Sequence, residues 1–150
     1  MVRDLLILTI FPGAMAIAAI IDLATLTVPN RLVIGLAALF VLVAPVAGLG
    51  LQDIGLHAAL ALVALALSFV LFSLGLVGGG DAKLFAATCL WLGPVAIVPY
   101  ALYAALIGGA HALLLLFWRG LPLPAMLASQ GWLVRLHNPE QGVPYGVALA

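Results

Sequence analysis

Long apolar runs, separated by short polar segments, dominate the amino-acid sequence. A helix that crosses the hydrocarbon layer of a bilayer needs about 20 predominantly apolar residues. Five runs approach or reach this length, namely residues 5–21, 32–50, 56–77, 84–98 and 100–118. The pattern therefore predicts an all-α fold, a polytopic membrane helix bundle with five full spans.

The fourth and fifth runs are separated only by Pro94 and Pro99. One kinked helix is an alternative, because proline bends a helix without always ending it. A single helix of about 35 residues would, however, far exceed a bilayer core about 30 Å thick. We therefore expect a tight reversal between residues 94 and 100.

The segment after Arg119 is polar and interrupted by prolines, so it is not expected to span the membrane. Its apolar side chains suit the membrane interface. Residues 144–150 resemble the first turns of a sixth helix, although seven residues are too few to cross. We expect residues 1–150 to form a single integral-membrane domain whose last helix is truncated.

Composition supports a membrane protein and excludes several kinds of site. Hydrophobic residues make up 67% of the chain and charged residues 7%, whereas an ordinary soluble domain has about 25% charged residues. The formal net charge is zero, so no nucleic-acid-binding surface is indicated. The single cysteine, Cys89, excludes an intrachain disulfide and a multi-cysteine zinc site. We expect neither a metal nor a cofactor.

Basic residues indicate the orientation, because loops retained in the cytoplasm are enriched in Lys and Arg. With five alternating spans, one side carries four basic residues, Arg31, Lys83, Arg119 and Arg135, and the other side carries Arg3. The N-terminus is then outside. A cleavable signal peptide is an alternative for the first run, but Asp4 cancels the charge of Arg3 and the apolar run continues to Asp22.

Two aspartates, Asp22 and Asp81, are predicted at the cytoplasmic ends of their spans. Asp22 ends the first apolar run, and Asp81 follows Gly78, Gly79 and Gly80 at the start of the fourth. An acid inside a membrane costs at least a few kcal/mol, so function is the default hypothesis. The alternative is that each aspartate caps a helix.

Two facing carboxyl groups in a pocket of low dielectric constant share one proton, because they do not both ionise easily. The ionised group acts as a general base on water, and the protonated group donates to the scissile carbonyl oxygen. The three glycines leave room for a substrate backbone beside Asp81. Their alternative role is that of a flexible connector.

Two motifs resemble those of the type IV prepilin peptidases of bacteria and their archaeal preflagellin relatives. The first is Ile21-Asp22-Leu23, followed by Val28-Pro29-Asn30-Arg31-Leu32. The second is Gly78-Gly79-Gly80-Asp81-Ala82-Lys83-Leu84, which continues to Trp91-Leu92-Gly93. A third stretch, Pro144-Tyr145-Gly146-Val147-Ala148, is similar to the entry of the family's last helix. The resemblance thus extends over nearly the whole chain.

The resemblance implies a six-span peptidase of the bacterial inner membrane, with Asp22 and Asp81 as the catalytic pair. It would remove the basic leader of prepilins or pseudopilins at the cytoplasmic face, with pilus assembly machinery as a further partner. Pro29, Asn30 and Lys83 would help to shape the substrate site. The chain looks like the short form associated with Flp-type, tight-adherence pili, because it lacks the cysteine-containing insert linked to methylation.

Three other functions compete with this hypothesis. A small proton- or cation-coupled membrane transporter would use the same carboxylates, but such acids are expected near the bilayer midplane. A noncatalytic pilus assembly protein and a presenilin-like peptidase are the others. His57 and His111 have no metal-ligand spacing and are expected to be structural or to face a pore. Asp53 falls in the opposite loop, which excludes it from the pair.

Overall fold

The computed structural model describes residues 2–124, 126, 127 and 129–150, with side chains from residue 9 onward. In these residues all regular structure is helical, which confirms the all-α class. The helices are α1 (Val2–Thr25), α2 (Asn30–Val46), α3 (Leu51–Ser73), α4 (Gly79–Arg119), α5 (Gly131–His137) and α6 (Gly146–Leu149).

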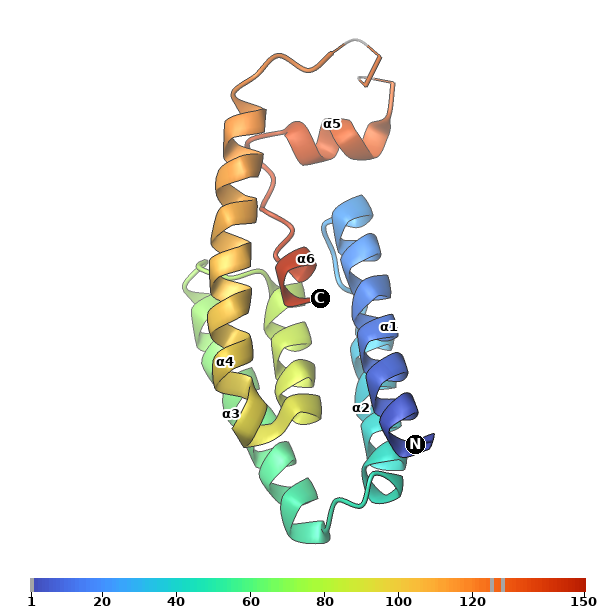
Figure 1. Ribbon diagram of the computed structural model, residues 1–150. Coiled ribbons are helices and arrows are strands. Elements are labelled where there is room, and N and C mark those ends of the chain that lie inside the picture. Colours follow the sequence, from blue (N-terminus) through green and yellow to red (C-terminus); the bar gives the residue numbers. More distant parts are fainter. Residues whose placement is uncertain (1, 125, 128) are drawn as a thin grey trace.

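The long helices run alternately up and down an elongated bundle (Figure 1). The ends of α1 and α3 and the starts of α2 and α4 therefore lie toward one end of the molecule, and the loop from α2 to α3 lies at the other. α4 packs against both α3 and α2, and α1 packs against α2. This alternation brings chain segments that are far apart in sequence to the same end.

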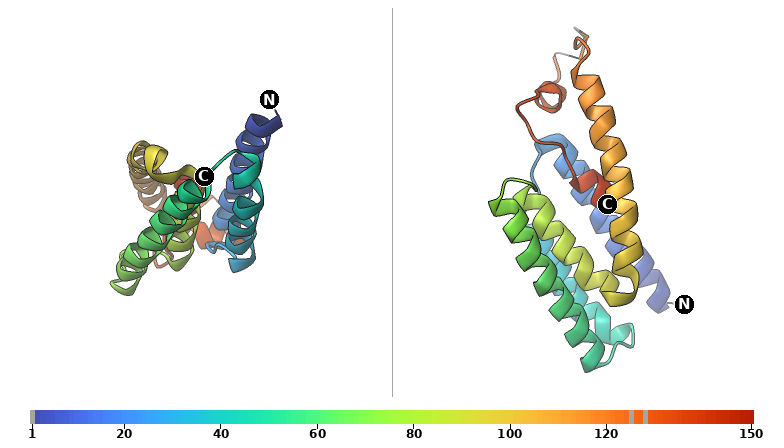
Figure 2. Two further views of the ribbon diagram at one scale, coloured as in Figure 1. Left: turned by 90° about the horizontal axis from the view of Figure 1, so that it is seen from below. Right: turned by 90° about the vertical axis from the view of Figure 1, so that its left-hand side faces the viewer.

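α4 turns back on itself at Gly93, as Figures 1 and 2 show. Gly93 has φ 66° and ψ −175°, a conformation that strongly favours glycine. Pro94 adds to the break, because proline disfavours helical geometry in the residue before it. The predicted reversal is present, but it lies at Gly93 and not over residues 94–100, which already belong to the helix after the break. We call residues 79–92 the first arm of α4 and residues 94–119 its second arm.

A histidine of the neighbouring helix α3 stabilises this reversal. The Nδ1 atom of His57 in α3 donates a hydrogen bond of 2.8 Å to the carbonyl of Leu90. The imidazole also fills the space where a Cβ atom at Gly93 would lie. The expectation of a structural role for His57 therefore agrees with its contacts.

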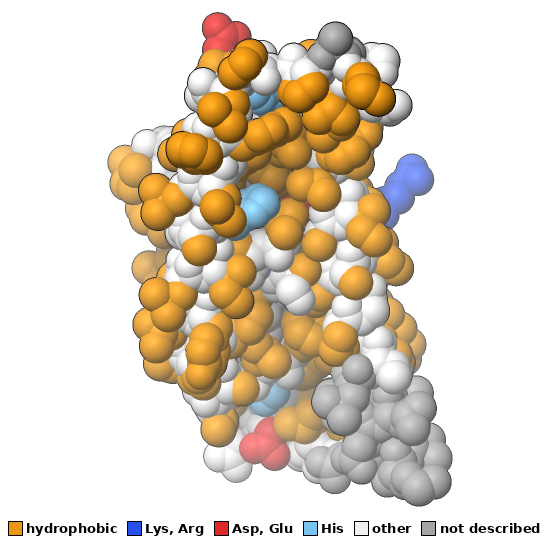
Figure 3. Space-filling view, turned by 45° about the horizontal axis from the view of Figure 1, so that its top comes forward, with side chains coloured by type: hydrophobic (Ala, Val, Ile, Leu, Met, Phe, Trp, Pro, Cys, Tyr) orange, Lys and Arg blue, Asp and Glu red, His pale blue; other side chains and the backbone are white. Residues whose placement is uncertain are grey.

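Two helices, α3 and α4, are long and apolar enough to cross a membrane. Only 11% and 17% of their most apolar windows are buried in the protein, so these are not core helices of a soluble domain. Among the residues whose side chains are described, α1 contributes the apolar stretch Thr9–Thr25, and α2 is an apolar helix of 17 residues, shorter than a full span. Five full spans are thus not confirmed. Hydrophobic side chains cover most of the face in Figure 3, and acidic ones show only near its two ends.

The core lies where the first arm of α4 meets α1 and α2. Met15, Leu36 and Leu84 are almost completely buried there. The indole N–H of Trp91 donates a hydrogen bond of 3.0 Å to the carbonyl of Leu36, which joins α4 to α2. This packing joins the first arm of α4 to α2 and to the middle of α1.

The C-terminal part returns into the bundle. α5 lies across its upper end in Figure 1, and the chain then descends to α6, which packs against both α1 and α4. Ala148 and Leu149 are buried. The expectation that a helix begins after Pro144 is correct, since α6 starts at Gly146.

Candidate active site

Asp22 lies one turn before the end of α1. The helix ends because Leu26 has a positive φ of 55°, and its N–H closes the last turn on the Asp22 carbonyl at 2.7 Å. The Thr25 hydroxyl donates to the carbonyl of Ile21 at 2.7 Å. Only 4% of Asp22 is exposed. A buried acid needs polar partners, because an unpaired one is costly to bury.

Asp81 lies in the first turn of α4, just after the three glycines. Gly78 precedes the helix in an extended conformation, with φ −68° and ψ 141°. A Cβ atom on Gly78 would lie 2.7 Å from Oδ2 of Asp81, and one on Gly80 would lie 3.1 Å from the backbone nitrogen of Val28. Gly78 and Gly80 therefore allow the close approach of the Asp81 carboxyl and of Val28, beyond any use as a connector.

Both aspartates line one cavity of about 380 Å³. Its walls also include Gly78, Gly79, Gly80 and Lys83, together with the 26–28 turn and residues 141–144. The two carboxyl groups interact electrostatically. Asp81 borders a second opening of about 630 Å³ between residues 75–78 and Tyr145. The structure thus brings together two acids that are 59 positions apart, and one of them also lines a neighbouring cavity.

The Asp22 carboxylate has a backbone partner. The N–H of Gly146 donates a hydrogen bond of 2.9 Å to its Oδ2 atom. A Cβ atom at position 146 would lie 2.7 Å from the same oxygen and 2.9 Å from Cγ. Asp22 therefore has one oxygen engaged by the protein, and α6 approaches it closely only because residue 146 is glycine.

Lys83 joins α4 to α2. Its Nζ atom donates a hydrogen bond of 2.6 Å to Oδ1 of Asn30, the first residue of α2. Pro29 takes the position before that helix, with φ −68°. Neither Pro29 nor Asn30 lines the aspartate cavity, whereas Lys83 does. Asn30 therefore reaches the site only through Lys83.

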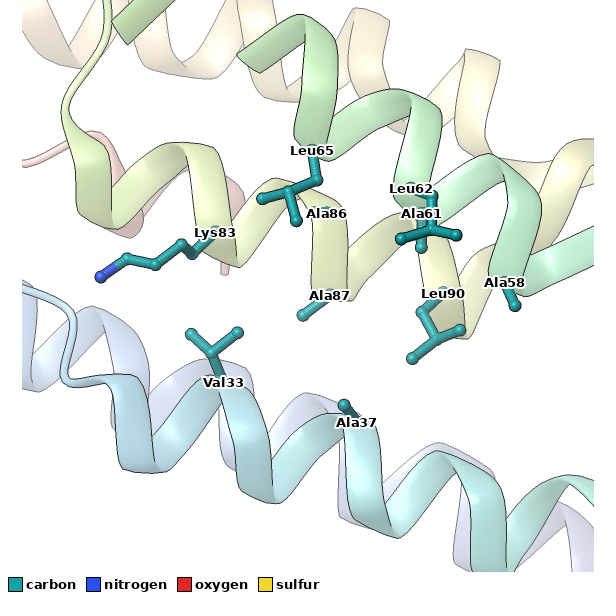
Figure 4. Close-up of a pocket in the computed structure, with 10 residues that line it drawn as sticks. All are labelled: Val33, Ala37, Ala58, Ala61, Leu62, Leu65, Lys83, Ala86, Ala87 and Leu90. Atoms are coloured by element: carbon teal, nitrogen blue, oxygen red, sulfur yellow. The ribbon is translucent and has the colours of Figure 1, made fainter. Parts of the chain in front are cut away.

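An apolar cavity of about 350 Å³ adjoins the site between α2, α3 and the first arm of α4 (Figure 4). Alanine, valine and leucine side chains form its walls, and Lys83 is its only ionisable lining residue. It offers no pair of groups for acid–base chemistry. The aspartate cavity is therefore the candidate active site.

Asp53 and His111 do not line the aspartate cavity. Asp53 accepts an N–H bond of 3.3 Å from Gly50 at the start of α3, at the opposite end of the bundle. His111 in α4 interacts electrostatically with Asp22, and within the described part of the chain its buried Nε2 atom has no hydrogen-bond partner. No group of three or more potential metal ligands occurs among the described residues.

The sequence did not identify Gly146 as a contributor to the site, beyond its place in the entry to a helix. Gly146 acts through its backbone N–H on a residue 124 positions away, for which a local pattern gives no signal. The combination Pro-Tyr-Gly before a buried stretch was the available indication of a close approach at Gly146.

The arrangement suits hydrolysis by two acids. The carboxyl groups face one cavity, which has room for water and for an extended backbone beside glycines. The family model described as the type IV leader peptidase family matches residues 9–113, more than half of the chain. The match includes both aspartates and Lys83. No curated protein and no solved structure matches significantly.

Proposed function

The chain belongs to the type IV leader peptidase family, and we propose that it removes the leader from type IV, Flp-like prepilins with Asp22 and Asp81 as its catalytic residues. The observation that carries the proposal is the cavity which both acids line. The family supports a membrane peptidase with a pilin-type substrate. The aspartic mechanism and the Flp-type precursor are the further steps proposed.

The hydrogen bond from Gly146 is the basis for assigning the general base to Asp22 and the general acid to Asp81. Because Oδ2 of Asp22 accepts this N–H, its Oδ1 atom is the oxygen left to take a proton from water. The water oxygen then attacks the scissile carbonyl carbon, while a protonated Asp81 donates to the carbonyl oxygen. Asp22 then gives the proton that it took from water to the leaving nitrogen, and the C–N bond breaks. A hydroxyl proton of the intermediate returns to Asp81, so that the leader leaves with a new carboxyl group and the remaining chain with a new amine. No covalent intermediate is formed.

The three glycines leave room for the substrate beside the acids. Gly78, Gly79 and Gly80 line the cavity without side chains, so an extended substrate strand is able to approach Asp81. Asn30 and Lys83 fix the neighbouring start of α2 through their hydrogen bond. These residues are proposed to shape the substrate site rather than to react.

The basic residues support a cytoplasmic location for the site. Lys83 contacts the start of α2, and Arg135 donates a hydrogen bond of 3.2 Å to the carbonyl of Ala24 at the end of α1. Both contacts lie at the end of the bundle that holds the aspartate cavity. Since basic residues are retained inside, we place this end at the cytoplasmic face of the bacterial inner membrane, with the N-terminus outside.

The test is cleavage of a pilin-like precursor by the reconstituted protein. Asp22→Asn and Asp81→Asn should each lower kcat by about 1,000-fold or more, since each removes a group that transfers a proton. Asp53→Asn, at the opposite end, is the matched control and should cleave normally. Normal cleavage by either active-site variant would refute the two-acid mechanism. An inactive wild type whose ion flux is altered by both variants would favour a transporter.

A further inference from the structure

Arg119 ends α4 and binds three carbonyl groups of the chain that follows. Its Nε atom donates to Leu136 at 2.8 Å, and its two terminal nitrogens donate to Gln141 and Gly142, each at 3.0 Å. The planar guanidinium holds several donors in a fixed fork, which lysine does not provide. These hydrogen bonds therefore attach the loop between α5 and the cavity wall to the end of α4.

The segment held by Arg119 leads directly into the active site. Gln141, Gly142, Val143 and Pro144 line the aspartate cavity. Four residues after Gly142, the N–H of Gly146 reaches Asp22. The position of this segment therefore determines where the Gly146 N–H lies relative to the Asp22 carboxylate.

The far end of the same segment is also fixed. Tyr145 packs against Gly108 of α4 so closely that a Cβ atom there would collide with its ring. The Tyr100 hydroxyl donates to the carbonyl of Leu149. The 141–146 segment is thus attached to α4 on both sides, with Arg119 as its attachment on the cavity side.

A purely topological role does not account for these contacts. A basic residue that only anchors a loop in the cytoplasm keeps its charge in water. Arg135 comes closer to that case, since its side chain is exposed and one hydrogen bond links it to Ala24. Arg119 donates to three carbonyls, one in α5 and two in the loop that follows it.

We propose that Arg119 is a positioning residue that holds the 141–146 segment in place, so that the N–H of Gly146 orients Asp22 for proton transfer. This inference rests on the proposed peptidase function. Arg119 touches neither substrate nor the reacting atoms, and its effect passes through the backbone to Gly146. The two residues should therefore behave as one unit.

Kinetics of precursor cleavage test this coupling. Arg119→Lys and Gly146→Ala should each lower kcat about tenfold or more with KM changed less than twofold. The first loosens the segment that carries the Gly146 N–H, and a hydrogen bond to a charged group contributes about one to two powers of ten. The second keeps this N–H but brings a Cβ atom to 2.7 Å from Oδ2 of Asp22, which displaces both groups. The double variant should be no slower than the slower single variant. Arg135→Lys should cleave normally. Additive losses, or a change in KM alone, would overturn the proposal.

Cysteine labelling tests the same attachment without activity. The native Cys89 is only 1% exposed, so a cysteine introduced by Val143→Cys reports on the cavity wall. Adding Arg119→Lys should raise its labelling rate by a membrane-impermeant maleimide severalfold, whereas adding Arg135→Lys should not. An unchanged rate would overturn the proposal. The cleavage and labelling results also distinguish a failure of the proposed function from a failure of the positioning role. If the wild type cleaves no precursor, the proposed function fails, and the labelling rate then tests whether Arg119 holds the segment. If only Asp22→Asn and Asp81→Asn are inactive, the function stands and the positioning role is wrong.

Discussion

Replacing Gly78 by alanine should separate catalysis from folding. The backbone of Gly78 is extended, with φ −68° and ψ 141°, so alanine fits it without strain. The new Cβ atom would lie 2.7 Å from Oδ2 of Asp81, whereas ordinary contacts are 3.4–4 Å. The carboxylate must therefore retreat by about 0.7 Å, the difference between 3.4 Å and 2.7 Å. Misplacing a reacting group by about 1 Å costs on the order of 100-fold in rate.

We therefore expect Gly78→Ala to lower kcat by about 10- to 100-fold. The thermal midpoint should be unchanged or higher, because alanine in an allowed conformation adds about 0.4–1 kcal/mol of stability through the unfolded chain. Single-turnover cleavage in detergent or liposomes measures the rate. Gly142→Ala is the matched control, since it lines the same cavity and its Cβ atom would meet nothing within 4 Å. A Gly78→Ala enzyme with wild-type kcat would refute the claim that the position of the Asp81 carboxylate limits catalysis.

Three further substitutions test the frame around the site. Gly93→Ala should destabilise the protein by roughly 2–5 kcal/mol, because its backbone is left-handed and its Cβ atom would overlap with the ring of His57. The control is Gly109→Ala, whose Cβ atom would meet nothing within 4 Å and which should not lower the unfolding midpoint. Tyr100→Phe should cost about 1–3 kcal/mol because it leaves a carbonyl of α6 without its donor, and an unchanged midpoint would contradict that contact. Lys83→Met and Asn30→Ala should show a coupling of about 0.5–1.5 kcal/mol in a double-mutant cycle, and strictly additive effects would show that their hydrogen bond contributes nothing.

Local sequence signals were sufficient for the helical class and for the common position of the acids. Apolar runs imply helices in lipid, since backbone groups there need partners within the segment. Alternation of the runs then places the residue that ends the first run and the residue that begins the fourth at one end. A reversal near Pro94 was predictable because a single apolar helix of about 35 residues would far exceed a bilayer core about 30 Å thick. Its position at Gly93, in a left-handed conformation, was not predicted.

The cavity wall formed by residues 141–144, and the Gly146 contact that follows it, were not predictable in this way. Arg119 reaches carbonyls 17 to 23 positions ahead, and Gly146 reaches an acid 124 positions behind. Every residue has a backbone carbonyl and, apart from proline, an N–H, so such partners leave no mark in composition or periodicity. The short apolar stretch after Pro144 was interpreted as the start of a span, whereas its contact with Asp22 depends on how α1 and α4 pack.

The long-range bond from Gly146 to Asp22 also orders events in time. Position 146 is translated 65 positions after Asp81, or roughly 3–13 s later at about 5–20 residues per second. A growing chain therefore carries both acids before it carries the amide that orients one of them. Under the proposed function, we expect a nascent chain to reach its full cleavage rate only after residue 146 has been synthesised and its N–H has reached Asp22.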